Sequence, residues 1–226
     1  MNVAVLGTGV VAKALAGRLS ALGHAVQMGT RDPKATLARS EPDMAGGPPL
    51  RTWLEANPKV VLTTFAEAAR HGELIVNALS GHGALAGLTL AGQAALAGKV
   101  MLDISNPLDF SKGMPPSLTV SNTDSLGEQV QRAFPEAKVV KTLNTVNAYL
   151  MVDPGQLAGG DHTMFVAGND AGAKAQVTRV LQSFGWKDVV DLGDISQARG
   201  LEMYVPLWVR LYGALKSPMF NVKLVR

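Results

Sequence analysis

The sequence of 226 residues predicts an α/β fold, a doubly wound parallel sheet with a short α/β C-terminal extension. Short apolar runs rich in β-branched residues alternate with helix-length segments along most of the chain, which is typical of a parallel sheet covered by helices on both faces. The alternation resumes after residue 150, so the extension is expected to pack on the sheet. Right-handed crossovers then favour the doubly wound strand order.

The predicted elements follow this alternation from the N-terminus. Six strands are expected before residue 150, at 2–6, 25–29, 59–63, 73–79, 99–104 and 138–143. Five helices are expected between them, at 10–22, 33–40, 65–71, 84–96 and 126–134. Surface loops rich in proline and glycine are predicted at 42–49 and 110–116. The extension is expected to hold strands at 163–167 and 188–192, a helix at 171–184 and a long helix from residue 196.

The composition excludes several classes of protein. Apolar residues make up 47% of the chain and charged residues 17%, which argues against long disorder. The net charge is +3 and the basic residues are scattered, so nucleic acid is not an expected partner. The absence of cysteine excludes disulfides and thiolate metal sites, so redox chemistry would need a cofactor. With no basic leader and no run of ~18 apolar residues, a cytoplasmic protein without membrane contact is predicted.

A glycine-rich turn follows the first predicted strand and opens a helix. Gly7 permits a tight turn and Gly9 lets the backbone approach a pyrophosphate, while the helix N-terminus offers free N–H groups. We therefore expect Gly7, Thr8, Gly9, Val10 and Val11 to bind a dinucleotide, as in an NAD(P)-binding Rossmann fold. The alternative is a tight turn without a ligand. With this assignment, residues 1–150 are predicted to be the dinucleotide-binding domain and 151–226 an extension that forms one wall of the site.

The end of the second strand indicates which dinucleotide is bound. An acidic residue there would bind the ribose hydroxyl of NAD, whereas this chain has Thr30, Arg31 and Lys34, which suit the extra phosphate of NADP. In the alternative interpretation, Asp32 binds the ribose and the two cations are solvated. Asp32 before Pro33 fits better as a helix N-cap with proline in the first turn, so NADP is the predicted cofactor.

Small polar residues follow the fourth strand, at the sheet edge where ligands bind in this fold. Ser80, Gly81 and His82 lead into a helix and are expected to contact the cofactor. A simple helix cap would explain Ser80 nearly as well. His82 is a candidate proton donor, although a lone histidine is more often a residue of the rim. Hydride transfer between rings needs placement more than acid–base groups, so no catalytic side chain is assigned, and no metal site is expected.

The fifth and sixth strands also end in polar residues. Asn106 and Pro107 are expected to border the nicotinamide, and the Asn144 amide to bind the nicotinamide carboxamide or else to belong to an ordinary turn. Asp103 is expected to accept hydrogen bonds from the backbone. In the last helix, apolar residues at helical spacing predict core packing, and Arg199 and Glu202, three positions apart, predict an exposed ion pair.

The ordered set of motifs resembles the coenzyme F420-dependent NADP oxidoreductases, a family whose fold also forms the reductase domains of the STEAP membrane ferric reductases. The likeness covers nearly the whole chain. The matching segments are GTGVVA at 7–12, LGH at 22–24, GTR at 29–31, DISNPL at 103–108, KTLNT at 141–145, VAGND at 166–170, DLG at 191–193, AR at 198–199 and LE at 201–202. The resemblance implies hydride transfer between NADPH and a flavin-like or deazaflavin ring, with the two rings stacked over the carboxyl ends of the strands.

The predicted function is therefore an NADP-dependent oxidoreductase with coenzyme F420 or a flavin as the second substrate. Two alternatives remain open: an NADP-binding redox sensor without catalysis, and a hydroxyacid or imino-acid dehydrogenase. The dehydrogenases generally add a large all-helical domain, whereas the segment after residue 150 is predicted to alternate strands and helices. The expected partners are a small-molecule redox substrate and, as one option, a second copy of the chain in a homodimer.

Overall fold

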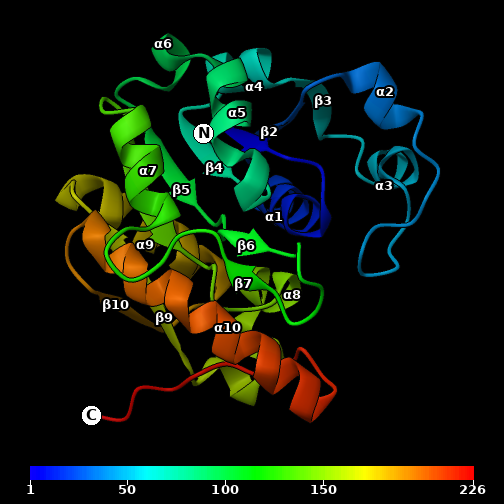
Figure 1. The fold of residues 1–226 in the computed structure, drawn as a ribbon. Coiled ribbons are helices and arrows are strands. Elements are labelled where there is room, and N and C mark those ends of the chain that lie inside the picture. The colour runs from blue at the N-terminus through cyan, green and yellow to red at the C-terminus, as the bar shows by residue number, and fades with distance from the viewer.

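A computed structural model describes all residues, 1–226, and contains an eight-stranded sheet in the order β10-β9-β8-β5-β4-β1-β2-β3 (Figure 1). The strands are β1 (Asn2–Leu6), β2 (Ala25–Thr30), β3 (Val61–Thr64), β4 (Leu74–Asn77), β5 (Val100–Asp103), β8 (Lys138–Thr142), β9 (Thr163–Gly168) and β10 (Asp188–Asp191). The order is doubly wound about β1, as the sequence predicts. The eight predicted strands are all present, with ends that differ by one or two residues.

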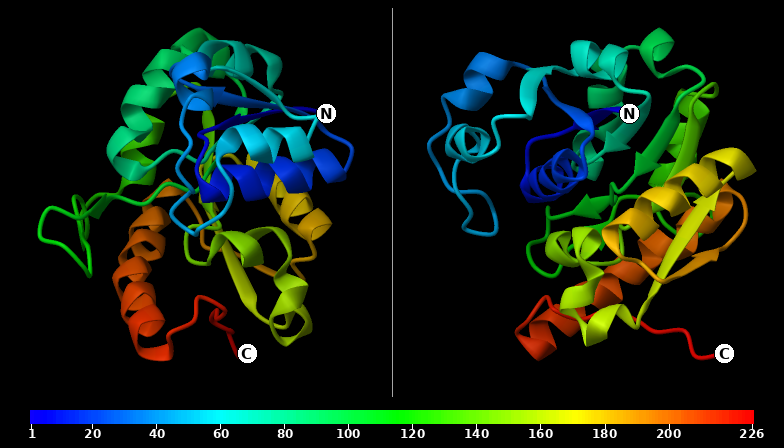
Figure 2. Two further views of the ribbon diagram at one scale, coloured as in Figure 1. Left: turned by 90° about the vertical axis from the view of Figure 1, so that its right-hand side faces the viewer. Right: turned by 180° about the vertical axis from the view of Figure 1, so that it is seen from behind.

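Helices cover both faces of the sheet (Figure 2). One core cluster contains residues of α1 (Val10–Ala21), α3 (Leu50–Ala56), α8 (Ala148–Val152) and α9 (Ala171–Phe184). The other contains residues of α4 (Phe65–His71), α5 (Gly81–Ala91), α6 (Gln93–Leu96), α7 (Leu126–Ala133) and α10 (Ala198–Leu215). The short helix α2 (Pro33–Leu37) contacts β3 and α3 at the edge of the sheet.

The strand side chains divide between these two layers with a period of two. In β1, Val3 and Val5 belong to the first cluster, while Ala4 and Leu6 belong to the second. All four are fully buried, which explains why the strand is a continuous apolar run rather than an alternating one.

β9 runs antiparallel to β8, which is the one departure from the predicted parallel sheet. For β9 to run parallel to β8, the connection between them would have to be long enough to return the chain to the end of the sheet where β8 begins. The helix between the two strands, α8, is 5 residues long and rises only about 7.5 Å, whereas the five residues of β8 extend about 16 Å. The carboxyl ends of β9 and β10 therefore lie at the opposite edge from those of the other six strands.

Several smaller elements differ from the predictions. The helix expected at 84–96 is divided by Gly92, whose φ of +93° ends α5 before α6 begins. Helices α3 and α8 were not expected. The loop at 110–116 lies between two short strands, β6 (Leu108–Asp109) and β7 (Ser117–Leu118). Three 3₁₀ turns are also present, η1 (Pro154–Gln156), η2 (Ala158–Gly160) and η3 (Ile195–Gln197).

The C-terminal extension continues the sheet and then crosses back over it. Its two strands form one edge of the sheet, and α10 packs against α7 on the face opposite α9 (Figures 1 and 2). The last residues run beside β9, where Thr163 N donates to the Val222 carbonyl at 3.0 Å. The predicted boundary at residue 150 falls within α8, and the division into two domains stays a prediction. None of the helices combines the length and apolar character needed to cross a membrane.

Candidate functional site

The turn between β1 and α1 has the geometry that a dinucleotide phosphate requires. Gly7 has a φ of +127°, and a Cβ there would lie 2.6 Å from the Ala78 carbonyl oxygen. Gly9 is exposed, and a Cβ there would meet nothing within 4 Å, so its backbone is open to a ligand. Ala12 is fully buried where α1 packs on the sheet. The tight turn, the open backbone and the close packing of helix on strand are the geometric features that the sequence predicts here. Thr8, Val10 and Val11 are partly exposed around the turn.

Two helix N-termini lie side by side at the carboxyl ends of β1 and β4. The close approach of Gly7 to Ala78 joins the turn before α1 to the loop before α5. Neither helix has a side chain that caps its first turn, and neither has an acidic residue there. Free N–H groups with the positive end of the helix dipole favour an anion, so the backbone here fits a diphosphate.

The end of β2 presents two free cations. Arg31 and Lys34 are exposed, and neither forms an ion pair or side-chain hydrogen bond. Asp32 caps α2 by accepting from Ala35 N at 3.0 Å, with Pro33 in the first turn, as predicted. Thr30 is 7% exposed, and its hydroxyl pairs with that of Thr36 at 2.8 Å. The structure therefore leaves Arg31 and Lys34 as the groups most accessible to a phosphate.

The loop after β4 combines exposed and packed residues. Ser80 is the N-cap residue of α5, but its side chain makes no capping hydrogen bond and stays exposed. His82 is also exposed and has no hydrogen-bond partner. A Cβ on Gly81 would lie 1.9 Å from the Asn106 carbonyl oxygen, so glycine is required for the two loops to pack. Sequence reasoning assigned Gly81 to ligand contact and did not detect this packing role.

Asn106 and Asn144 hold the ends of β5 and β8 together. Asn106 Nδ2 donates to the Asn144 carbonyl at 3.0 Å, and Asn144 Nδ2 donates to Asn106 Oδ1 at 2.9 Å and to the Leu201 carbonyl at 3.0 Å. Asn144 is 5% exposed, and its Oδ1 is buried with no partner. This oxygen retains the capacity to accept a hydrogen bond. Pro107 is buried, so of the predicted nicotinamide contacts in this loop Asn106 is the more accessible.

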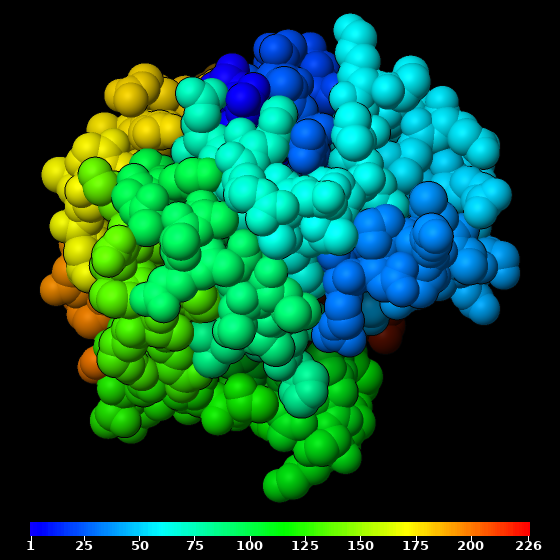
Figure 3. Space-filling model, turned by 90° about the horizontal axis from the view of Figure 1, so that it is seen from above, coloured from blue at the N-terminus to red at the C-terminus, as the bar shows by residue number.

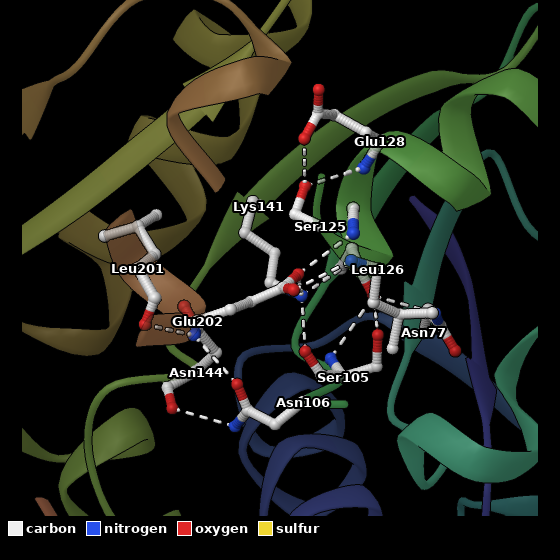
Figure 4. A network of polar contacts seen from close by, with 12 residues as sticks. Asn77, Ser105, Asn106, Ser125, Leu126, Glu128, Lys141, Asn144, Leu201 and Glu202 are labelled. Carbon is white, nitrogen blue, oxygen red and sulfur yellow. Dashed lines mark hydrogen bonds and ion pairs between the residues drawn. The ribbon is translucent and has the colours of Figure 1, made fainter. Parts of the chain in front are cut away.

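A buried polar row lies beneath these loops (Figure 4). Asn77, Asp103 and Lys141 are register partners across β4, β5 and β8. Asp103 Oδ1 accepts from Asn77 Nδ2 at 2.8 Å and from the Ser105 hydroxyl at 2.7 Å, and its Oδ2 accepts from Lys141 Nζ at 3.0 Å. Lys141 also donates to the Ser105 carbonyl. Asp103 thus binds side chains as well as the backbone donor of Ser105 that the sequence suggested.

Glu202 of α10 completes this network. Its Oε1 lies 2.8 Å from Lys141 Nζ, and the carboxylate accepts from Leu126 N at 2.8 Å and Gly127 N at 2.9 Å, at the start of α7. Lys141 and Asp103 are fully buried and Glu202 is 1% exposed. Burial alone would lower the pKa of Lys141, but the two facing carboxylates outweigh this and raise its pKa above the ordinary value.

The predicted exposed pair between Arg199 and Glu202 is wrong. Arg199 instead forms a bidentate pair with Glu128, with Nε–Oε2 and Nη2–Oε1 distances of 2.9 and 2.6 Å. Glu202 lies four residues after Ala198 and three before Val205, both of which are buried, so its helical position indicates the inner face of α10. The spacing from Ala198 and Val205 could have indicated that Glu202 is buried. The rule that pairs opposite charges three or four residues apart describes exposed helix faces, so it did not apply to Glu202.

Two surface hollows lie away from the predicted cofactor positions. One of about 610 Å³ is at the opposite edge of the sheet, where Arg132, Glu136, Lys138 and Asp170 are among its lining residues. Its charges are partly satisfied within the protein, since Lys138 pairs with Asp170 at 3.1 Å. The other, of about 280 Å³, lies between α2 and α3 and includes Arg39 and Arg51. Seen from above, residues of the first half of the chain form much of the visible surface of the molecule (Figure 3).

The fold and the glycine turn define a dinucleotide-binding protein of the Rossmann class. A family model described as NADP oxidoreductase, coenzyme F420-dependent, matches residues 2–107. The crystal structure of a candidate F420-dependent NADP-reductase from Arthrobacter sp. FB24 is 61% identical over 99% of both chains, with a TM-score of 0.96. The chain belongs to this NADP oxidoreductase family.

More distant relatives extend the likeness. The chain is 29% identical to rat metalloreductase STEAP3 over 96% of its length and 26% identical to human metalloreductase STEAP2 over 97%. It spans 38% of the length of each of these curated relatives. A Streptomyces aurantiacus imine reductase shares the fold at 18% identity and a TM-score of 0.60, covering 96% of this chain and 63% of that one.

The two glycines of the turn provide a matched test of this geometry. Gly7→Ala should lower the free energy of unfolding by roughly 1–3 kcal/mol, because φ is positive and the new Cβ meets the Ala78 carbonyl. Gly9→Ala should cost no more than about 1 kcal/mol, because its surroundings are open. Gly9→Ala should nevertheless weaken NADPH binding. Urea denaturation and calorimetric titration measure the two effects, and equal losses of stability would contradict the assigned roles.

Proposed function

We propose that the protein transfers a hydride between NADP(H) and a flavin-like or deazaflavin ring such as coenzyme F420. Family membership supports the NADP half. The ring acceptor is supported by the composition of the loops at 80–83 and 106–107, which contain small residues and an amide but no arginine or lysine to bind a substrate carboxylate. When bound, NADP(H) supplies the hydride chemistry, so the protein's task is to bind and orient two rings.

The cofactor fits the residues at this edge. The uncapped start of α1 and the open backbone of Gly9 suit the diphosphate, and α5 adds a second set of N–H groups beside it. Arg31 has the planar fork that suits the adenosine 2′-phosphate, and Lys34 adds a second positive charge. Because Thr30 is already paired with Thr36, we assign it to holding the shape of this loop, with a contact to the phosphate as the less favoured role.

The nicotinamide half would lie on the other side of the turn, over β4 and β5. The unpartnered Oδ1 of Asn144 matches the N–H₂ donor of a carboxamide, and the partly exposed Asn106 amide is beside it. Ser80 and His82 would line the rim, with the free Ser80 hydroxyl near the ribose. No side chain in this set is assigned a proton transfer.

Two other functions are less favoured. A hydroxyacid or imino-acid dehydrogenase would need a charged or acid–base group facing the nicotinamide, and residues 151–226 alternate strands and helices rather than forming a helical domain. A sensor that binds NADP without turnover has the same cofactor site, so only an assay separates it. Metal reduction, which the STEAP relatives' name describes, would require an electron carrier between the two-electron hydride and a one-electron metal.

Removing the Arg31 guanidinium should discriminate between the two nicotinamide cofactors. Arg31→Ala is expected to weaken NADPH binding roughly 10- to 150-fold, since a charge-assisted phosphate contact contributes about 1.5–3 kcal/mol. NADH binding should barely change. Calorimetry on both cofactors measures this, with Arg70→Ala, at the far end of α4, as a control for the change in net charge. Equal losses for NADPH and NADH would remove the phosphate assignment.

The second substrate can be identified with an acceptor panel. NADPH oxidation should be fast with a deazaflavin or flavin and slow with hydroxyacid or imine pairs. Ferric chelates and quinones belong in the panel because they test for one-electron acceptors. Turnover restricted to a hydroxyacid or imine would replace the proposed function, and NADPH binding without turnover on any acceptor would favour the sensor.

The role of His82 is tested by its removal. Because the side chain is exposed and has no partner to orient it, His82→Ala should lower turnover by much less than the ~100-fold or more expected for a general acid. The matched control is His71→Ala. His71 is the last residue of α4, and its Nε2 is hydrogen-bonded to the Ala25 carbonyl. A 100-fold loss with NADPH affinity intact would make His82 a proton donor.

A further inference from the structure

The buried network contains two carboxylates and one cation. Glu202 receives hydrogen bonds from Leu126 N, Gly127 N and Lys141, and all three partners are donors. Asp103 likewise receives donors from Asn77, Ser105 and Lys141. Neither carboxyl group faces an acceptor to which it could give a proton, so both are held as anions. The pKa of Lys141 is raised, so it carries one positive charge, and the cluster has a net charge of −1.

No further cation in the network neutralises this net negative charge. Asn77 and Ser105 are neutral, and the adjacent Glu128 is balanced by its own partner, Arg199. The three charged side chains are 0–1% exposed, so water screens them poorly. A buried net charge therefore acts on whatever binds at the surface above it.

The cluster lies on the nicotinamide side of the glycine turn. Leu6, which precedes Gly7, pairs with Asn77, Asn77 pairs with Asp103, and Asp103 pairs with Lys141. Neighbouring strands are about 4.8 Å apart, so Asp103 lies roughly 10 Å along this row from the turn. Arg31 is on the opposite side, at the end of β2. A dinucleotide with its phosphate at Arg31 must extend its other half over β4 and β5, above the cluster.

We propose that the unbalanced charge of the Asp103–Lys141–Glu202 cluster favours the oxidised cofactor and so makes bound NADPH a stronger hydride donor. This inference rests on the proposed binding of NADP(H). The oxidised nicotinamide ring carries a positive charge that the reduced ring lacks, and a buried negative charge stabilises only the former. Two electrons and a proton would pass together as a hydride to the acceptor ring, so a cluster that stabilises the cationic product would favour transfer in that direction.

The size of the effect follows from Coulomb's law. For a separation between ring and cluster on the order of 10 Å, two unit charges at an effective dielectric constant of about 20 change a binding ratio about 15-fold. Glu202→Gln removes the excess charge and should therefore raise Kd(NADP⁺)/Kd(NADPH) by about 5- to 20-fold. Glu202→Asp disturbs the packing but keeps the charge, so the ratio should change by less than about twofold. Kd values for both forms come from calorimetric titration without an acceptor.

Glu128→Gln is the matched control, since it removes a carboxylate in the first turn of α7, near the cluster. The partner of Glu128, Arg199, is 37% exposed, so water screens the same change of charge and the ratio should rise less than in Glu202→Gln. Asp103→Asn provides a second route to the same charge change if Glu202→Gln does not fold, as thermal denaturation would reveal. An unchanged ratio in the folded charge-removing variant, or an equal rise in Glu202→Asp, would overturn the inference and leave the proposed function intact. Failure of the unaltered protein to bind either form would overturn the proposed function itself.

Discussion

The buried contact of Lys141 with Asp103 and Glu202 is the constraint on which the site depends. Three charges without water are stable only while each keeps its partners, and removing one partner of such a pair typically costs about 3–5 kcal/mol. Lys141 therefore holds β5, β8 and α10 in one arrangement, and Glu202 extends that arrangement to the start of α7. The loops that follow these strands carry Asn106 and Asn144, so the floor of the site inherits its geometry from the cluster.

The antiparallel β9 explains how α10 reaches this cluster. β9 and β10 end at the far edge of the sheet, and the segment that includes η3 then leads the chain back past β9 and β8 to α7, where α10 begins. Leu201 then meets Asn144 and Glu202 meets Lys141 in the first turns of the helix. A Cβ on Gly127 would lie 2.9 Å from Ala198 Cβ, so a glycine in α7 permits the close approach.

The accuracy of the sequence predictions depends on how local the determining interactions are. The strand β1, the roles of Gly7 and Ala12, and the Asp32 cap were predicted because each depends on residues a few positions apart. The contact of Thr30 with a phosphate stays a prediction, while its hydrogen bond to Thr36 is a structural role that the sequence did not reveal. The partner of Glu202 is 61 residues away in the chain, and no spacing rule connects them. The helical position of Glu202 indicated burial, but the identity of its partner required the fold.

The same distinction separates the two halves of the proposed cofactor site. The phosphate half is made of backbone N–H groups and a glycine turn, whose geometry is encoded within residues 7–12, so it can persist while distant parts of the chain change. The proposed nicotinamide half is made of side chains that are ordered by contacts among β5, β8 and α10. Substitutions in α10 can therefore alter the position of Asn144 and the charge beneath it without touching a ligand.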